Sequence, residues 1–139
     1  PDCGMTADLI VGFPGEKEED HAQTLEFIKR CGFSSMHIFP YSKRPGTKAA
    51  EMEGQLPNAV KARRAAQAQK VADELEAAYL NSCIGRRLEV LFESEKDGMS
   101  SGHASNYTHV YVHNGNMRGI VKNVKINGIT NKMLVGICI

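Results

Sequence analysis

Two short apolar runs on either side of one amphipathic segment constrain the fold of this chain more than any other feature. Residues 6–13 (TADLIVGF) and 34–41 (SSMHIFPY) are typical of strands buried on both faces, as in parallel sheets. Between them, acidic residues crowd the first turn of a predicted helix, basic residues crowd its last turn, and Gly32 follows as a helix-ending residue. Strand, helix and strand with short joints predict a right-handed βαβ unit, the repeat of an α/β barrel or a doubly wound sheet.

The second half of the chain begins with a long predicted helix, and short segments typical of strands follow it. Residues 57–83 have the apolar spacing of a helix, which Gly85 ends. The segments beyond it are rich in β-branched residues: RRLEVLFE, NYTHVYVHN, GIVKNVKIN and KMLVGICI. Turns rich in Gly and Asn divide them, including Asn114-Gly115 and Asn127-Gly128. This pattern predicts four or five short antiparallel strands, which fit a small closed barrel of the OB-like kind.

The predicted fold class is therefore α/β over residues 1–84, followed by a small all-β barrel over residues 85–139. One βαβ unit has only two neighbouring strands and cannot cover both faces of each, so their packing partners are expected upstream in the same polypeptide. The chain also begins without Met and almost directly in a strand. We therefore expect a piece of a longer protein.

Charge and cysteine content exclude several classes of protein. The net charge of +1 gives no argument for a polycation, although residues 85–139 carry seven Lys or Arg against four Asp or Glu, a weak sign of an anionic partner. Four cysteines without a CxxC pair predict free thiols in a reducing cytoplasm rather than a disulfide framework or a metal site. No apolar run approaches the ~20 residues that span a bilayer, so no membrane association is expected.

The turn IVGFPGE, residues 10–16, follows the first predicted strand and opens the first predicted helix. Its glycines, Gly12 and Gly15, permit tight turning and close backbone approach, and the helix N-terminus beyond would favour a polar or anionic ligand group. It is neither a P-loop nor a GxGxxG fingerprint. A purely structural strand-to-helix turn explains the spacing equally well.

Three polar side chains, Tyr41, Lys43 and Arg44, follow the second predicted strand in HIFPYSKRPGT, residues 37–47. In α/β barrels the carboxyl ends of the strands carry the active-site loops. Two cations suit phosphate or carboxylate there, and the tyrosine can stack or form a hydrogen bond. The alternative is a solvated loop with two surface cations and a Pro-Gly turn.

The segment GHASNYTHVYVHN, residues 102–114, gathers imidazole and aromatic side chains. Alternation places His109, Tyr111 and His113 on one face, with two valines on the inner face. Such faces near cations commonly hold single-stranded RNA. A zinc site lacks suitable third and fourth ligands, and an exposed polar face without a ligand stays a serious alternative.

Together, TADLIVGFPGEKEED, HIFPYSKRPGTKAAEM and GHASNY resemble the C-terminal part of the radical S-adenosylmethionine methylthiotransferases, and the resemblance runs from Thr6 to Ile139. VGFPGE is shared by many radical S-adenosylmethionine enzymes. FPYSKRPGT followed by GHASNY is narrower, and is most similar to the branch that acts on threonylcarbamoyladenosine in tRNA, next to the anticodon. The resemblance implies that residues 1–84 end a radical-SAM partial barrel and that residues 85–139 form a TRAM domain, a small RNA-binding barrel.

The resemblance also implies cofactors and a partner. The intact enzyme would use S-adenosylmethionine and two [4Fe–4S] clusters, which need thiolate ligands. Neither set of cluster cysteines is in this chain, so it is expected to be inactive alone, without a metal site or a catalytic residue of its own. Contacts to S-adenosylmethionine are expected from Ile10, Val11 and Gly12. The tRNA anticodon stem-loop is expected to meet eight residues: Tyr41, Lys43, Arg44, Arg86, Arg87, His103, Asn106 and Tyr107.

Three other interpretations stay open. One is a methylthiotransferase for isopentenyladenosine in tRNA or for a ribosomal protein. Another is a non-enzymatic RNA-binding protein whose TRAM-like barrel works alone, and a third is a structural interaction module that binds no RNA. Two departures from the family are expected to weaken local stability: Lys17 stands at the place of a Thr helix cap, and His21 at the place of an aromatic residue.

Overall fold

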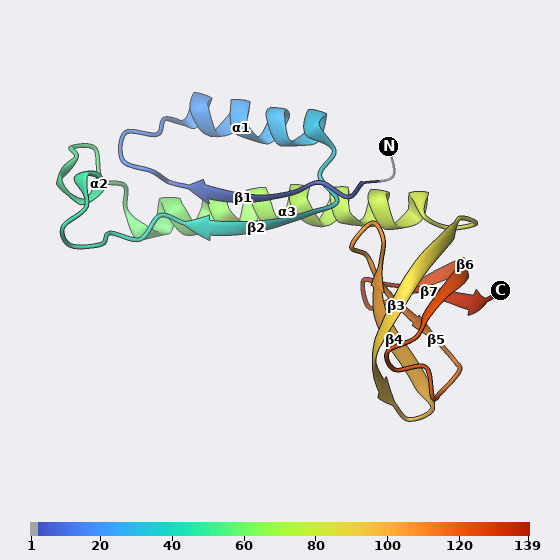
Figure 1. Cartoon of the computed structure of the whole chain (residues 1–139). Coiled ribbons are helices and arrows are strands. Elements are labelled where there is room, and N and C mark those ends of the chain that lie inside the picture. Colours follow the sequence, from blue (N-terminus) through green and yellow to red (C-terminus); the bar gives the residue numbers. More distant parts are fainter. Residues whose placement is uncertain (1–2) are drawn as a thin grey trace. The chain divides into compact units, whose positions relative to one another are not determined.

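The computed structural model describes residues 3–139, which divide into two compact units (Figure 1). Met5–Glu76 forms one, here called the sheet unit, and the other, here called the barrel unit, contains Ala77–Ile139. The division falls within the long helix α3, Asn58–Ser82. The boundary expected at residue 84 lies just beyond the end of this helix.

The sheet unit contains the βαβ arrangement that the sequence predicts. Strand β1 (Thr6–Val11) leads into helix α1 (Glu18–Cys31), and strand β2 (Ser35–Pro40) returns parallel to β1. The pairing runs from Thr6 opposite Ser35 to Val11 opposite Pro40. Both strands therefore end at the same edge of the sheet, which places the two loops that follow them side by side.

Local signals explain where α1 begins and ends. The Asp20 carboxylate accepts a hydrogen bond of 2.8 Å from the backbone N–H of Lys17, so an acidic residue of the first turn caps the helix although Lys17 cannot. At the other end Gly32 adopts φ 64°, the left-handed conformation that glycine tolerates best, and its N–H donates to Ile28 O. A one-turn helix, α2 (Lys48–Glu51), follows β2.

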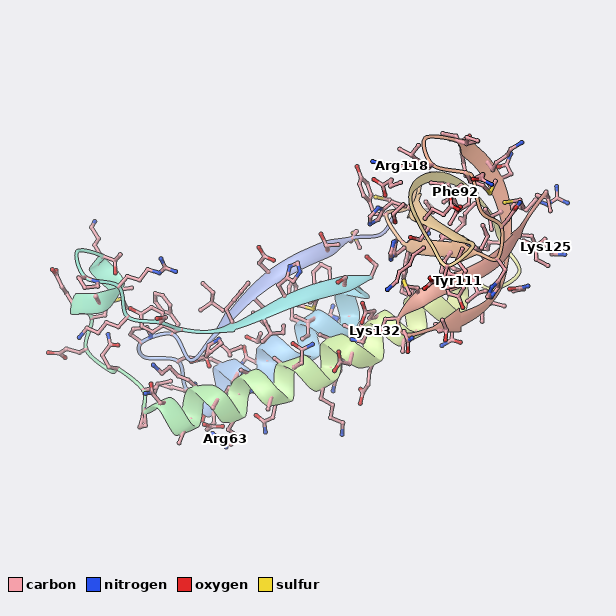
Figure 2. All side chains as sticks on the ribbon, turned by 90° about the horizontal axis from the view of Figure 1, so that it is seen from below. Arg63, Phe92, Tyr111, Arg118, Lys125 and Lys132 are labelled. Carbon is pink, nitrogen blue, oxygen red and sulfur yellow. The ribbon has the colours of Figure 1, made fainter. Side chains whose placement is uncertain are left out.

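Only one face of the two-stranded sheet is covered within the described residues. Ile28 of α1, Met36 of β2 and Val71 of α3 share one buried cluster, and Figure 2 shows both helices on the same side of the strands. On the other face Ile10 is 54% and Phe39 49% exposed. The sequence predicts strands buried on both faces. The structure differs because no described element of the sheet unit packs against the second face.

The barrel unit is a closed barrel of five strands in the order β3-β4-β5-β7-β6. The strands are β3 (Arg87–Lys96), β4 (Met99–Ala104), β5 (His109–Val112), β6 (Val121–Thr130) and β7 (Met133–Cys138). Its interior holds fully buried side chains, with Phe92 the largest apolar one (Figure 2). Leu80 and Cys83, from the end of α3 and just after it, pack into the same core. The predicted closed barrel is therefore present.

Three details of the barrel differ from the sequence prediction. Strand β4 was not among the predicted runs, because MSSGHA has no β-branched residue. Strands β5 and β7 pair in parallel rather than antiparallel. Asn127-Gly128 lies inside β6 at a change of register, and the turn to β7 is formed instead by Asn131 and Lys132, at φ 46° and 60°.

No helix of residues 3–139 combines the length and the apolar character that crossing a membrane requires.

Candidate functional site

The two loops at the edge where β1 and β2 end form the first candidate site, here called the strand-exit cluster: Gly12, Phe13, Tyr41 and Lys61. The Val11 carbonyl accepts a hydrogen bond of 2.8 Å from the Tyr41 N–H, which ties the loops together. The Phe13 and Tyr41 rings meet edge to face with centroids 5.3 Å apart. The Lys61 ammonium lies 5.9 Å from the centre of the Tyr41 ring, within reach of a cation–π interaction.

Gly12 allows helix α3 to approach this cluster. It is buried and adopts φ 72°, and a Cβ placed on it would come within 2.5 Å of Lys61 Cγ. Any larger residue would therefore meet both backbone strain and a clash. The sequence indicates that Gly12 permits close approach of another group. In the structure that group is Lys61 of α3, which belongs to the protein itself.

A charged network holds the turn between β1 and α1. The Glu16 carboxylate accepts the Gly12 N–H at 3.0 and 3.1 Å, and Arg64 Nη1 donates to it at 2.6 Å. Arg64 is 2% exposed, and it also donates to Glu16 O and to Glu18 Oε1, at 2.9 and 2.7 Å. Burial alone would lower the Arg64 pKa, but its hydrogen bonds with Glu18 and Glu16 outweigh burial and raise that pKa. The guanidinium therefore stays charged, and the backbone around Gly12 is fixed to α3.

His21 lies beside this network and does not simply disturb packing. The imidazole is buried, and its Nε2 lies 3.0 Å from Gln67 Oε1 on α3, within hydrogen-bond distance. Its Nδ1 is 4.0 Å from Glu16 Oε1 and has no hydrogen bond within the described residues. The expected loss of stability at this position is therefore offset in part by a bond from α1 to α3.

The three residues expected to contact S-adenosylmethionine have different surroundings. Ile10 projects its side chain onto the open face of the sheet, whereas Val11 is 1% exposed and faces the covered side. The Gly12 N–H is already bonded to Glu16. Of the three, Ile10 alone offers a side chain to a ligand, and Val11 and Gly12 offer backbone.

The residues expected after β2 partly come together with Ile10. Ile10, Phe39, Tyr41 and Arg44 line one hollow at the strand-exit edge. A second hollow, on the other side of Tyr41, is lined by Lys43 and Lys61 among others. The Tyr41 hydroxyl is buried without a hydrogen-bond partner in the part of the chain that the structure describes.

The sequence missed Lys61, Glu16 and Arg64 as members of this site. Lys61 and Arg64 come from α3, far along the chain from both loops, and no local spacing connects them. The only usable signal was the basic character of the first half of this helix.

In the barrel unit, two of the expected RNA contacts lie where strand β3 begins. Arg86 is half-buried, and Arg87 is exposed and stands directly opposite Lys125 of β6, the residue labelled in Figure 2. Like charges directly opposite each other destabilise a sheet unless an anion lies between them. The pair therefore suits a phosphate.

His103, on the outside of β4, has two neighbours. Its Nδ1 lies 2.5 Å from Glu93 Oε2, and its ring stacks on that of His109 with centroids 5.0 Å apart. Burial lowers the pKa of His109, the nearby His103 lowers it further, and Glu93 opposes both. The alternation that places His109, Tyr111 and His113 outside the barrel is confirmed, since Val110 and Val112 are buried.

Asn106 and Tyr107 point in opposite directions. Asn106 is 2% exposed: its Oδ1 accepts from Thr108 N and Oγ1 at 3.2 and 2.6 Å, and its Nδ2 donates to Cys83 Sγ at 3.6 Å. The carboxamide of Asn106, which was expected near RNA, is therefore bonded inside the protein. Tyr107 follows at φ 65° and is 80% exposed, so Asn106 shapes the turn that presents the tyrosine.

The described residues do not fit an iron–sulfur cluster. Among residues 3–139 no group of three or more Cys, His, Asp or Glu side chains is arranged to hold a metal. Cys3, Cys31, Cys83 and Cys138 are free thiols, and Cys83 is enclosed in the barrel core.

Comparison with known proteins gives relatives across both units. The chain is 40% identical over 131 residues to threonylcarbamoyladenosine tRNA methylthiotransferase MtaB of Bacillus subtilis, covering 91% of the chain and 29% of that protein. It is 35% identical over 140 residues to tRNA-2-methylthio-N(6)-dimethylallyladenosine synthase of Rickettsia canadensis, covering 98% and 31%. The synthase of the same name in Maricaulis maris is 45% identical over 102 residues, covering 73% and 22%. No protein-family model matches. The chain spans about three tenths or less of the length of these relatives.

Proposed function

Because the chain belongs to the radical S-adenosylmethionine methylthiotransferase family over the part of its relatives that it spans, we propose that it is the C-terminal part of a tRNA methylthiotransferase. The observation that carries the proposal is coverage: 91% and 98% of the chain align with two relatives that are both named for methylthiolation of tRNA. A lone RNA-binding barrel would be expected to match over residues 85–139 alone, yet the similarity extends across both units.

As substrate we propose N6-threonylcarbamoyladenosine next to the anticodon, to which the intact enzyme adds a 2-methylthio group. The support is the identity of 40% over 91% of the chain with the Bacillus subtilis relative named for this nucleoside. The second candidate is dimethylallyladenosine, and the identity of 45% with the Maricaulis maris synthase, over 73% of the chain, favours it.

The strand-exit edge fits a bound S-adenosylmethionine. Ile10 and Phe39 give the hollow an apolar wall for an adenine ring, and the backbone of Val11 and Gly12 continues from Ile10 into the loop beyond β1. When bound to a reduced iron–sulfur cluster, the cofactor supplies the radical that starts the reaction. The role of this chain is positioning, since the cluster ligands would have to come from outside residues 3–139. Alone the chain would then be inactive.

Exposed cations of both units would hold the tRNA anticodon stem-loop. Lys43 and Arg44 are exposed, and no ion pair within the described residues uses either of them. Arg87 of β3 lies opposite Lys125 of the neighbouring strand β6, and no ion pair among residues 3–139 uses either of these two side chains. Lys and Arg of this kind bind phosphate oxygens. In this proposal the protein binds the tRNA in the cytoplasm.

The test is a chimera with the Bacillus subtilis relative. The segment of that protein that aligns with this chain is replaced by residues 1–139, and the chimera is expressed in cells that lack the native enzyme. We expect tRNA to regain 2-methylthio-N6-threonylcarbamoyladenosine, measured by mass spectrometry of digested nucleosides. The same chimera with Lys43→Gln and Arg44→Gln should form less product.

The other outcomes are equally informative. The 2-methylthio group on dimethylallyladenosine alone would select the second candidate. No methylthio group on either nucleoside, from a chimera that folds and carries its clusters, would contradict the proposed function.

A further inference from the structure

The outer face of β4, β5 and β7 carries a groove of about 400 Å³ that contains none of the eight residues expected to meet the anticodon stem-loop. The inner faces of these strands are filled, since Val110, Val112 and Leu134 are at most 1% exposed. The outward residues of the same strands alternate with them and form the groove. It is lined by Lys96, Met99, Ser101, His109, Tyr111, Thr130, Asn131 and Met133.

Flat rings form one wall of the groove. Tyr111, labelled in Figure 2, lines the groove and pairs in register with Ser101 of β4 and Val135 of β7. The His113 ring meets Tyr111 edge to face with centroids 5.5 Å apart, and His109 is held on its other side by stacking on His103. The rings along β5 are therefore fixed by their neighbours, which lowers the entropy that a stacked ligand would have to remove.

Polar groups stand around the rings without partners. No hydrogen bond or ion pair among residues 3–139 uses the side chains of Lys96, Thr130 or Asn131. Asn131 is presented by a backbone at φ 46°, in the turn between β6 and β7. The groove thus combines a flat stacking surface, an amide and hydroxyls that can read the edge of a ring, and one ammonium group.

This combination fits an unpaired nucleobase better than other ligands. An apolar peptide or a lipid chain would leave the ammonium and the amide unsatisfied. A phosphate alone would not use the rings. An RNA strand satisfies both, because bases stack on aromatic faces and the phosphate beside each base seeks a cation. The excess of seven cationic over four anionic residues in 85–139 favours a nucleic acid over an acidic-patch protein.

We propose that the outer face of β4, β5 and β7 binds one unpaired RNA nucleobase, stacked on Tyr111 beside His109, with its phosphate near Lys96. This inference rests on the proposed function, because it takes RNA as the partner. It adds a base-binding site distinct from the exposed Tyr107 and from the Arg87–Lys125 pair, both of which lie elsewhere on the barrel.

The test uses the 139-residue chain and a short single-stranded RNA with one 2-aminopurine, a fluorescent base that is quenched when it stacks. We expect binding to quench the probe. Tyr111→Leu, which keeps an apolar side chain but removes the ring, should weaken binding by about tenfold, because it removes one base–aromatic stack. Tyr111→Phe should bind within about twofold of the wild type, since the stacking ring remains. Phe27→Leu, on the exposed side of α1 in the sheet unit, is the matched control and should change nothing.

A second experiment distinguishes the contribution of the base to binding from that of the RNA backbone. An RNA with an abasic nucleotide in place of the 2-aminopurine, followed by the anisotropy of a fluorescein label at its end, should bind the wild type only as well as the intact RNA binds Tyr111→Leu. Tyr111→Leu should lose little further affinity for the abasic RNA. Lys96→Gln should reduce the salt dependence of binding. The circular dichroism spectrum of each variant checks folding, and no change is expected because Lys96 is exposed and Tyr111 lies on the outer face of the barrel, half-buried.

Three results of the binding experiment would each overturn the inference. One is equal affinity of Tyr111→Leu and wild type for the RNA. Another is equal competition by a polyanion without bases, such as dextran sulfate. The third is no RNA binding at low salt. The chimera keeps the two proposals apart: if Tyr111→Leu leaves 2-methylthio product unchanged, the groove fails and the proposed function stands.

Discussion

The two units differ in how completely each buries its small sheet. In the barrel every strand pairs on both sides, and Val90, Phe92 and Val110 are completely buried inside. In the sheet unit each strand has one neighbour, and half of its surface stays open, with Ile10 and Phe39 about half exposed. A closed barrel needs no further element to complete its sheet, whereas two strands with an open face and free edges are an incomplete structure.

The difference extends to what holds each unit together. The barrel core is apolar, apart from Ser100, Asn106 and Thr108. The sheet unit adds to its apolar cluster a buried ion network, in which Arg64 joins Glu16 and Glu18 to α3. We infer that the loops at the strand-exit edge are positioned by charge and hydrogen bonds, and the outer face of the barrel by packing beneath it.

The most damaging change to the sheet unit alone should be Arg64→Ala. It leaves the nearly buried Glu16 carboxylate without its cation, and such losses cost about 3–5 kcal/mol. Hydrogen exchange measured by mass spectrometry should show faster exchange in β1 and α1, with the barrel strands unchanged. Arg63→Ala is the matched control, because Arg63 is exposed and pairs only with Glu18, so its loss should cost under about 1 kcal/mol. Equal effects of the two variants would show that the network does not hold the unit.

The corresponding change in the barrel is Gly102→Ala. A Cβ at Gly102 would lie 1.8 Å from Leu91 O and 2.8 Å from Phe92 Cα, so β3 and β4 would have to separate. We expect a loss of about 3 kcal/mol, at the upper end of overpacking effects. Exchange should then rise in β3 and β4 while β1 and β2 keep their protection. Gly128→Ala is the control, because nothing lies within 4 Å of its added Cβ, and a large loss there would mean that strand flexibility rather than the clash is responsible.

Local chemistry predicted the elements of the sheet unit better than the pairing of the barrel. Acidic and basic turns and Gly32 mark the ends of α1, and two apolar runs mark β1 and β2. The parallel pairing of β5 with β7 brings together residues more than twenty positions apart, and no local pattern encodes it. Strand β4 was missed because small residues carry a weak strand signal, although its Gly102 is required by the close approach of β3.

Some residues of the candidate site could likewise be predicted from local sequence, and others could not. Parallel strands end at one edge, so Ile10, Tyr41 and Arg44 could be expected together and do line one hollow. Lys61 and Arg64 could not, because α3 returns to that edge only in the folded chain. Asn106 is the opposite case: the family resemblance placed it near RNA, yet the turn uses its carboxamide inside the protein.

A smaller, stabilising change should strengthen only the sheet unit. Lys17 stands at the N-cap of α1 with an extended backbone and no side-chain cap. Lys17→Ser supplies a hydroxyl that accepts from the first turn, and the Asp20 bond to the N-cap N–H can remain, which completes a capping box. We expect about 0.5–1 kcal/mol of added stability, seen as slower exchange in α1. Lys17→Ala is the control and should give little gain. If it stabilises as much as serine, removal of the lysine charge is the cause and the cap is not.

The smallest expected effect is a pH dependence confined to the barrel. Burial and the neighbouring His103 lower the pKa of His109, and Glu93 opposes them, so the folded barrel holds its proton less tightly than the unfolded chain does. Stability from this group is complete above the ordinary value of 6.5 and declines as pH falls below it, because the unfolded chain then binds more protons. Urea unfolding of the barrel between pH 7.5 and pH 5, followed by exchange in β5, should therefore show a decline that His109→Phe reduces. His113→Gln, directly after the end of β5, should leave the decline in place. If His109→Phe keeps the full decline, other groups cause it, and the neutral imidazole beside Tyr111 does not contribute to the stability of the groove.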